Sequence, residues 1–328
     1  ITKAIVAKLR QRKAPTAFKW VKGHDGHELN EGADKLAGRG AEKTTHDDVS
    51  LEIPPELKIV GARLNLITQK TAYRAIRVNK ARTTKKRAPT VRNIEKIKDD
   101  FNLAFGTKLR EETIWKAVRK REKITREAAQ WMWMSIHDAY MIGNNWLKPN
   151  MPDDLKKRAI CKACGQIETM EHVLFTCTAT GRETIWKALN AMCEATGMPE
   201  IVPDWGSIFA AGAIELKQEG NDERDTAGEM RWATLATEAA HLVWKLRCER
   251  VIANEGREHS EREVTQRWNA TIDRRLDLDR RTAAQMVGKR RKQTIARVEY
   301  TWSPLLEDSE NLPDDWVTSC GVLVGIKK

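Results

Sequence analysis

Hydrophobic residues recur at helical spacing along most of the chain, and only one short segment alternates as a strand does. The first apolar residues, beginning with Ile1, lie four positions apart and predict a short helix that ends before Pro15. Residues 16–22 then alternate around two aromatic side chains, which predicts a strand. From residue 28 to 41, apolar and small residues return every three or four positions and predict a second helix. The expected order at this end is helix, strand, helix.

The remainder of the chain has the spacing of helices. A helix around Ile76 and another that runs from Thr90, as its N-cap, to Phe105 are expected after a linker marked by Pro54 and Pro55. These helices lie in the part of the chain that carries most of its positive charge.

Residues 111–142 also show helical spacing and contain an unbroken run of two tryptophans and two methionines at 131–134. Such side chains mostly fill cores, so we favour a buried helix over a surface on which bases stack. Residues 226–254 and 261–288 are expected to form a helical hairpin, with a capping box that begins at Ser260. The predicted fold is therefore mostly α.

Length and composition narrow the class of protein. The 328 residues are 41% hydrophobic and 32% charged, which is enough apolar material for a packed core and about two domains. No run of about 18 apolar residues is present to span a membrane, and no leader supports secretion. We expect an intracellular protein, nuclear or cytoplasmic, without a membrane partner. Since the first residue is Ile1 rather than Met, we also expect a processed chain or a fragment.

The net charge of +12 is concentrated in one stretch. Residues 61–130 carry 20 basic and 7 acidic side chains, whereas residues 131–328 carry 27 and 30. A block of like charges repels itself unless counterions or phosphates neutralise it. We favour a nucleic-acid backbone as the partner, because each phosphate that the protein neutralises releases a counterion. A solvated face or a nuclear-import signal are the alternatives. The densest part, and the predicted nucleic-acid contact, is Lys80, Arg82, Lys85, Lys86 and Arg87.

Three of the six cysteines lie close together beside a histidine. The ligand types and spacing of Cys161, Cys164, His172 and Cys177 predict a zinc site, since Zn²⁺ favours four tetrahedral nitrogen and sulfur ligands. Gly165 follows the second cysteine, where a tight turn needs a positive φ. Four protein ligands fill the coordination shell, so the predicted role is structural. Buried thiols beside an unrelated histidine are the alternative, and a disulfide framework is less favoured.

Three remaining cysteines and one histidine show no catalytic pattern. Cys193, Cys248 and Cys320 have no adjacent base in the sequence, which argues against nucleophilic roles. His137, next to Asp138, could relay protons, but a hydrogen-bonded core histidine is favoured.

A second constellation joins the predicted strand and helix near the start of the chain. His24 lies in a glycine-flanked loop and Asp34 lies ten residues later on the helix. A loop histidine can move a proton near neutral pH, and a carboxylate can hold a hard cation. The ordered segment resembles the last strand, histidine loop and C-terminal helix of ribonuclease H type 1. The matching features are the strand Phe18–Val21, Gly23-His24, Gly26, Asn30-Glu31 and Asp34 followed by Leu36-Ala37.

That resemblance implies specific roles for these two residues. Asp34 would be one of four acidic residues around two Mg²⁺ ions, and His24 would assist proton transfer or product departure during cleavage of the RNA strand of an RNA–DNA hybrid. The resemblance covers only about residues 1–45, and the family's other three carboxylates come from elements that precede them. We therefore expect this chain to be the C-terminal portion of such an enzyme and to be inactive as it stands. Its expected protein partner is a preceding part of the same protein. A non-catalytic nucleic-acid-binding module or a retroelement relic is the alternative.

The Cys-Cys-His-Cys segment is similar to the zinc-binding segment downstream of reverse transcriptase in LINE-like, non-LTR retrotransposon proteins. The sequence thus predicts an α/β remnant of an RNase H-like fold followed by a helical domain with a small zinc module. The expected parts are a truncated RNase H type 1 domain (1–45), a basic helical linker (46–130), a helix with the zinc module (131–180) and a helical C-terminal domain (181–328).

Overall fold

The computed structural model is mostly helical. It describes residues 1–23, 25–45, 48–58, 67–218, 220, 222–319 and 321–327. Helices account for 61% of the structure and strands for 2%, and the described residues form no sheet. The mostly α fold class is therefore confirmed. The chain divides into two compact units, Ile1–Lys85 and Lys86–Lys328.

The first unit contains the two helices predicted at the start of the chain. Its described elements are α1 (Thr2–Gln11), α2 (Glu28–Ala41), the 3-10 helix η1 (Pro55–Leu57) and α3 (Gln69–Thr83). The strand predicted over residues 16–22 is wrong, because this segment has no regular secondary structure. Phe18 and Trp20 are both 83% exposed, so the alternation buries no face. A strand needs a neighbour for its backbone groups, and no described segment pairs with this one.

The second unit is built from α4 onward. Its α-helices are α4 (Ala88–Phe105), α5 (Glu111–Ala117), α6 (Arg126–Ile136), α7 (Asp153–Lys156), α8 (Thr180–Glu194), α9 (Trp205–Phe209), α10 (Thr226–Ile252), α11 (Glu261–Gln285) and α12 (Gly288–Trp302). Short 3-10 helices are η3 (Gly143–Asn145), η4 (Lys157–Ala159), η6 (Ala211–Ala213), η7 (Ser303–Leu305) and η8 (Ser309–Asn311).

Two details of the predicted helices differ from the structure. Arg87, not Thr90, occupies the N-cap of α4, and the Thr90 hydroxyl instead lies 2.8 Å from His137 Nδ1. The helical segment predicted over 111–142 is broken into α5 and α6 by turns. The break lets both helices pack against the same core, which one straight helix of that length cannot do.

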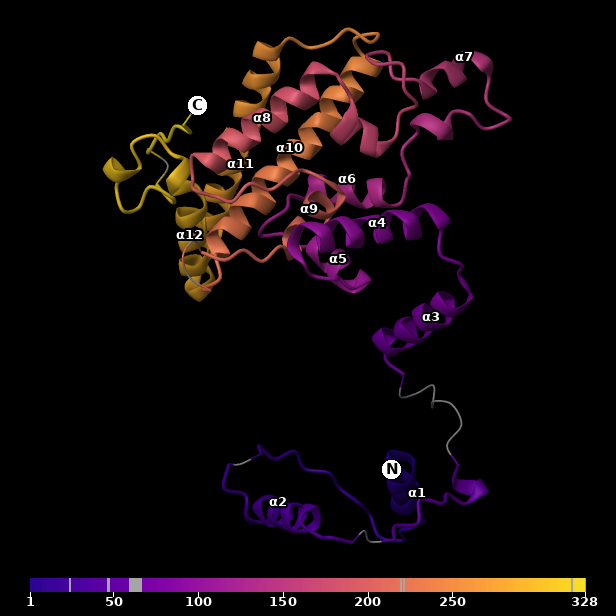
Figure 1. The fold of residues 1–328 in the computed structure, drawn as a ribbon. Coiled ribbons are helices and arrows are strands. Elements are labelled where there is room, and N and C mark those ends of the chain that lie inside the picture. Colours follow the sequence, from indigo (N-terminus) through magenta and orange to yellow (C-terminus); the bar gives the residue numbers. More distant parts are fainter. Residues whose placement is uncertain are drawn as a thin grey trace. The chain divides into compact units, whose positions relative to one another are not determined.

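The core of the second unit surrounds α10. Helix α10 packs against α8, α11 and α12, and it also contacts α6 and α9, while α11 packs against α8 and α12 (Figure 1). The predicted hairpin of α10 and α11 is confirmed, and the Ser260 hydroxyl accepts a hydrogen bond from the Glu263 N–H at 3.3 Å. Of the run 131–134, Trp131 and Met132 are buried, as the core interpretation predicted, whereas Trp133 is 48% exposed.

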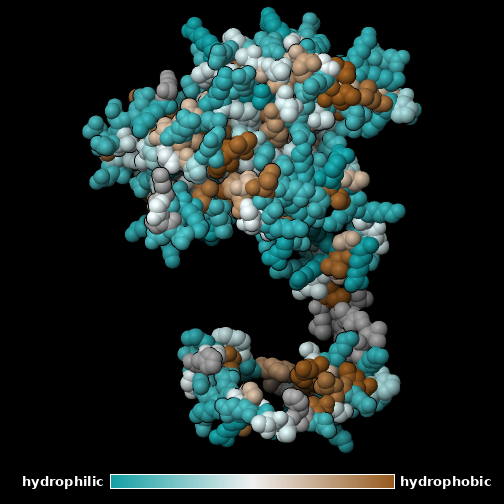
Figure 2. Space-filling model, viewed as in Figure 1, coloured by the Kyte–Doolittle hydropathy of each residue, from teal (hydrophilic) through white to brown (hydrophobic). Residues whose placement is uncertain are grey.

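The outer surface has the opposite character. Figure 2 shows hydrophilic side chains over most of the visible face of the second unit, with hydrophobic residues only in patches. Within the described part of the chain, no helix combines the length and the apolar character needed to cross a membrane.

Candidate metal centre

The first two cysteines lie on a tight turn closed by backbone hydrogen bonds. An antiparallel bridge joins Ile160 to Ile167, and the Cys161 N–H donates to the Gln166 carbonyl at 2.8 Å. The Gly165 N–H donates to the Cys161 carbonyl at 2.8 Å, and Gly165 has a φ of +74°. Its missing Cβ would meet no atom within 4 Å, so the backbone conformation alone explains the glycine. The turn directs both cysteines to one side.

The other two ligands come from one turn of π-helix. The π-helix η5 spans His172–Thr176, and the Cys177 N–H donates to the His172 carbonyl at 2.7 Å. This bond links residues five apart, so the wider turn places both side chains on one side of the backbone. The π-helix is thus the structural reason that His172 and Cys177, five positions apart, can face the same point.

The four predicted ligands meet in one cluster. Their ligand atoms all lie within 4.8 Å of one another. The Cys161 and Cys177 sulfurs are 3.7 Å apart, and the Cys164 sulfur is 3.4 Å from His172 Nε2. Tetrahedral zinc with Zn–S bonds of about 2.3 Å places two sulfurs roughly 3.8 Å apart, which matches the first of these distances. The three cysteines are free thiols rather than a disulfide pair. The group can therefore hold a zinc ion.

The surroundings of the sulfurs differ from one another. Burial raises the pKa of Cys161, but hydrogen bonds from His172, Arg250 and two backbone N–H groups outweigh it and hold that pKa well below its usual value. Burial raises the pKa of Cys177. A bound metal deprotonates both thiols outright. The Thr176 hydroxyl lies 3.4 Å from His172 Nδ1, which leaves Nε2 to face the cysteines.

A buried ion pair attaches this module to the helical core. Glu168 lies between the second cysteine and the histidine, and its carboxylate accepts two hydrogen bonds from Arg247 on α10. The Glu168 residue is 2% exposed and Arg247 is 8% exposed. The pair links segments that are 79 residues apart in the sequence.

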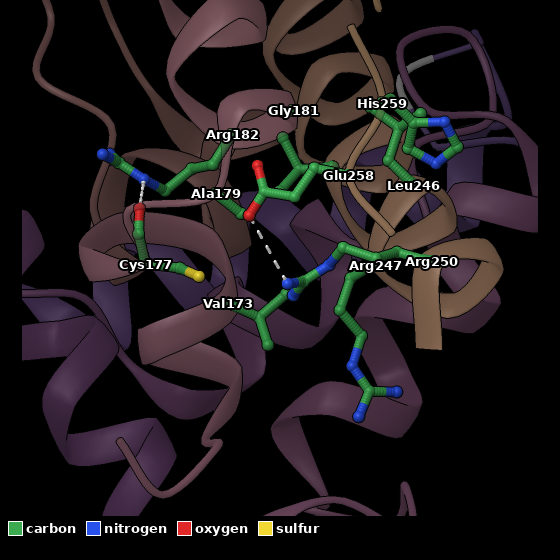
Figure 3. A pocket seen from close by; sticks show the side chains of 11 residues that line it. Val173, Cys177, Ala179, Gly181, Arg182, Leu246, Arg247, Arg250, Glu258 and His259 are labelled. Atoms are coloured by element: carbon green, nitrogen blue, oxygen red, sulfur yellow. Dashed lines mark hydrogen bonds and ion pairs between the residues drawn. The ribbon is translucent and has the colours of Figure 1, made fainter. Parts of the chain in front are cut away.

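Beside the cluster is a small cavity rather than a substrate pocket. It is lined by Val173, Cys177, Gly181 and Arg250, among others, and has a volume of about 20 Å³ (Figure 3). A space of this size holds roughly one water molecule. The centre therefore has four potential protein ligands, three of them buried, beside a cavity too small for a substrate.

The predicted nucleic-acid contact is divided between the two units. Lys80 and Arg82 lie on α3 and Lys85 follows it, whereas Lys86 and Arg87 begin the second unit. All five are exposed. Lys86 forms an ion pair with Glu111 at 2.7 Å, and this hydrogen-bonded partner raises the pKa of Lys86. One of the five cations thus has a partner within the protein.

The proposed RNase H residues are placed only in part. His24 lies outside the described residues. Asp34 is exposed on α2 and, in the part of the chain that the structure describes, belongs to no group of three or more potential metal ligands. The Mg²⁺ site implied by the resemblance thus has no ligand cluster among these residues.

His137 has the environment of a structural histidine. Besides Thr90 it stacks on Trp115, with ring centroids 5.3 Å apart. Burial and the nearby Arg87 lower its pKa. These contacts favour the hydrogen-bonded interpretation over a proton relay.

Sequence reasoning missed two features. Glu168 contacts Arg247 and Arg250 contacts Cys161, and no local sequence pattern predicts contacts between residues so far apart in the chain. The four consecutive cations Lys289–Lys292 at the start of α12 are visible in the sequence, but the net acidity of residues 131–328 obscures them.

Comparisons with known proteins add no relative. No protein-family model matches the sequence, and searches of curated proteins and of solved structures find no match. The resemblances to RNase H and to the retrotransposon zinc segment therefore depend on the sequence motifs alone.

Proposed function

We propose that this chain is a zinc-stabilised nucleic-acid-binding protein whose main contact with phosphate is the basic stretch 61–130. The observation that carries the proposal is α3. This helix of 15 residues has five cations and no acidic residue. Among the described residues, no carboxylate forms an ion pair with any of the five, which are Lys70, Arg74, Arg77, Lys80 and Arg82.

The charge on α3 favours a polyanionic partner. Lys70 and Arg74 are four residues apart and Arg77 follows three later, so like charges are neighbours along one side of the helix. Such pairs destabilise an isolated helix by a few tenths of a kcal/mol each. A nucleic-acid backbone removes this repulsion and releases its own counterions. The same charges would be unfavourable against an acid-poor surface.

The test is the salt dependence of binding. Fluorescence anisotropy with labelled RNA, duplex DNA and RNA–DNA hybrid compares the wild type with a variant in which Lys80, Arg82 and Lys85 are all replaced by Gln. If each contacts one phosphate, the slope of log K against log salt becomes shallower by about 2.7 on duplex DNA. Absent or salt-independent binding of the wild type would contradict the proposal.

A matched control removes three cations that have partners. Lys156, Lys187 and Lys217 each form a surface ion pair within the second unit. Replacing all three by Gln changes the net charge by the same amount. We expect the salt slope to stay at the wild-type value. An equal loss in both variants would assign the effect to net charge rather than to the basic stretch.

We also propose that the ion in the Cys-Cys-His-Cys cluster is structural Zn²⁺. Elemental analysis should find about one zinc per chain, the stoichiometry of one closed site. Cys164→Ser should lose it. A metal-free wild-type protein with the same helicity and thermal stability would refute this assignment.

The second candidate function is a role in hybrid ribonuclease activity. In its favour, α2 begins at Glu28 and ends at Ala41, where the resemblance requires a helix, and exposes Asp34. Two Mg²⁺ ions need several carboxylates, so we expect this chain alone not to cut a labelled hybrid. A longer form that supplies three more should cut with Mg²⁺, and Asp34→Asn should abolish cutting while Asp25→Asn does not. Equal cutting by the Asp34→Asn form would exclude the assignment.

A further inference from the structure

One buried cation next to the metal centre has an incomplete set of hydrogen-bond partners. Arg250 is 4% exposed on α10, and its Nη1 has no hydrogen-bond partner among the described residues. The nearest carboxylate, Glu258, lies 3.8 Å away, beyond hydrogen-bond distance. Among the described residues, its guanidinium donates one hydrogen bond, from Nη2 to the Cys161 sulfur at 3.7 Å.

Arg247, three residues earlier, shows what the usual solution looks like. Its guanidinium donates two hydrogen bonds to the buried Glu168 carboxylate. Burying a charge is unfavourable unless an opposite charge and hydrogen bonds compensate it. The group that accepts the hydrogen bond of Arg250 is a cysteine sulfur rather than a carboxylate. Besides the ion pair with Glu258 at 3.8 Å, the group that Nη2 can draw compensating charge from is therefore a thiolate.

The charges of a loaded centre supply this compensation. Zn²⁺ with three thiolates and a neutral imidazole has a net charge of −1, and one guanidinium brings the sum to zero. We propose that Arg250 is the outer-shell counterion of the metal centre formed by Cys161, Cys164, His172 and Cys177, and that it positions Cys161 and favours the metal-loaded state. This inference depends on the zinc site proposed above, and extends it to a residue 73 positions beyond the last ligand.

The geometry around Arg250 strengthens this interaction. Val243, Leu246 and Arg250 lie on one face of α10 and line the small cavity together with Cys177. Figure 3 shows the guanidinium extending across this space, with a dashed line to Glu258. Little water can enter, so the attraction between guanidinium and thiolate is screened less than at the surface.

The proposed role predicts opposite effects in the two states of the protein. In the loaded state, Arg250 is compensated and its removal weakens metal binding. In the metal-free state the fixed −1 charge of the loaded centre is absent, and Arg250 keeps only its 3.7 Å contact with the Cys161 sulfur and its 3.8 Å ion pair with Glu258. Replacing it by an apolar residue of similar length should therefore leave the metal-free protein at least as stable as the wild type. An arginine that only fills space would destabilise both states alike.

The experiment compares three variants of the full chain. Zn²⁺ affinity is measured by competition with a chromophoric chelator, Co²⁺ absorption reports the thiolate ligands, and thermal melting is recorded with and without metal. We expect Arg250→Met to bind Zn²⁺ roughly 10- to 100-fold more weakly, the usual range for outer-shell partners. Arg250→Lys keeps the charge and should recover part of the affinity.

Arg231→Met is the matched control. Arg231 is buried on the same helix but donates to the carbonyls of Tyr300 and Thr301, away from the cluster. It should melt earlier in both states and bind Zn²⁺ with wild-type affinity.

The outcomes are distinguishable. If the wild type binds no Zn²⁺ or Co²⁺, the zinc site itself is wrong. If the wild type binds metal and Arg250→Met binds it equally well, the counterion role is wrong. If Arg250→Met melts earlier by the same amount in both states, as Arg231→Met should, its role is packing and the inference is overturned.

Discussion

The buried pair between Glu168 and Arg247 gives the sharpest test of how the metal module is held to the helical core. Glu168→Gln keeps the shape of the side chain but removes its charge, so the Arg247 guanidinium stays buried without a counterion. Removing one partner of a buried pair typically lowers the free energy of unfolding by 3–5 kcal/mol. The amide oxygen can still accept one hydrogen bond, so we expect the lower end, about 3 kcal/mol. At an m-value of about 3 kcal/mol/M, the urea midpoint falls by about 1 M.

Urea unfolding followed by far-UV circular dichroism, at saturating zinc, measures this loss. The double variant Glu168→Gln with Arg247→Met should lose less than the sum of the two single variants, since neither charge is then left alone. Asp153→Asn is the control because it removes a surface pair with Lys156, and we expect a change within about 0.5 kcal/mol. A loss in Glu168→Gln no larger than in this control would refute the reasoning.

Three further predictions concern packing, pH and metal. A Cβ on Gly206 would lie 2.3 Å from the Phe101 backbone nitrogen. Gly206→Ala should therefore lower the free energy of unfolding by about 1–3 kcal/mol in the urea assay. An unchanged urea midpoint would show that α4 and α9 can move apart without cost. Burial, with a smaller effect of Lys245, lowers the pKa of His241 from 6.5 to about 4. As the pH falls, the unfolded chain therefore binds this proton before the folded chain does. The stability that the neutral histidine contributes is fully present above pH 6.5, and about 3 kcal/mol of it is lost as the pH falls toward 4. His241→Leu should lack that part of the pH dependence, and identical profiles would contradict the assignment. Chelation of zinc should lower the melting temperature, because a ligand present at a thousand times its Kd contributes about 4 kcal/mol; Cys164→Ser should show no such shift.

The helices at both ends of the chain were predictable because their signals are local. The spacing of apolar residues placed α2 over 28–41, and Ser260 marked the start of α11. The strand over residues 16–22 was predicted from equally local alternation and is wrong. Alternation describes only one face of a strand, and whether a strand forms depends on a neighbour for its backbone groups, which no local pattern specifies.

The candidate site residues also fall into those with a local sequence signal and those without one. The ligand set could be predicted because a gap of two residues and a gap of four residues each lie within a single turn, and the structure brings all four ligands together. The Asp34 and His24 roles stay predictions, since His24 lies outside the described residues and Asp34 belongs to no group of potential metal ligands among them.

By itself, the sequence determined the cysteine and histidine set of the candidate metal centre, the helical fold class and the concentration of positive charge in residues 61–130. Only the tertiary structure decided that Glu168 pairs with Arg247 and that Arg250 meets Cys161. Those partners are 79 and 89 positions apart. Their pairing follows from the packing of α10 against the metal module, where burial makes an uncompensated charge unfavourable. Spacing along the chain can specify which atoms bind a metal, but burial decides which distant charge must balance it.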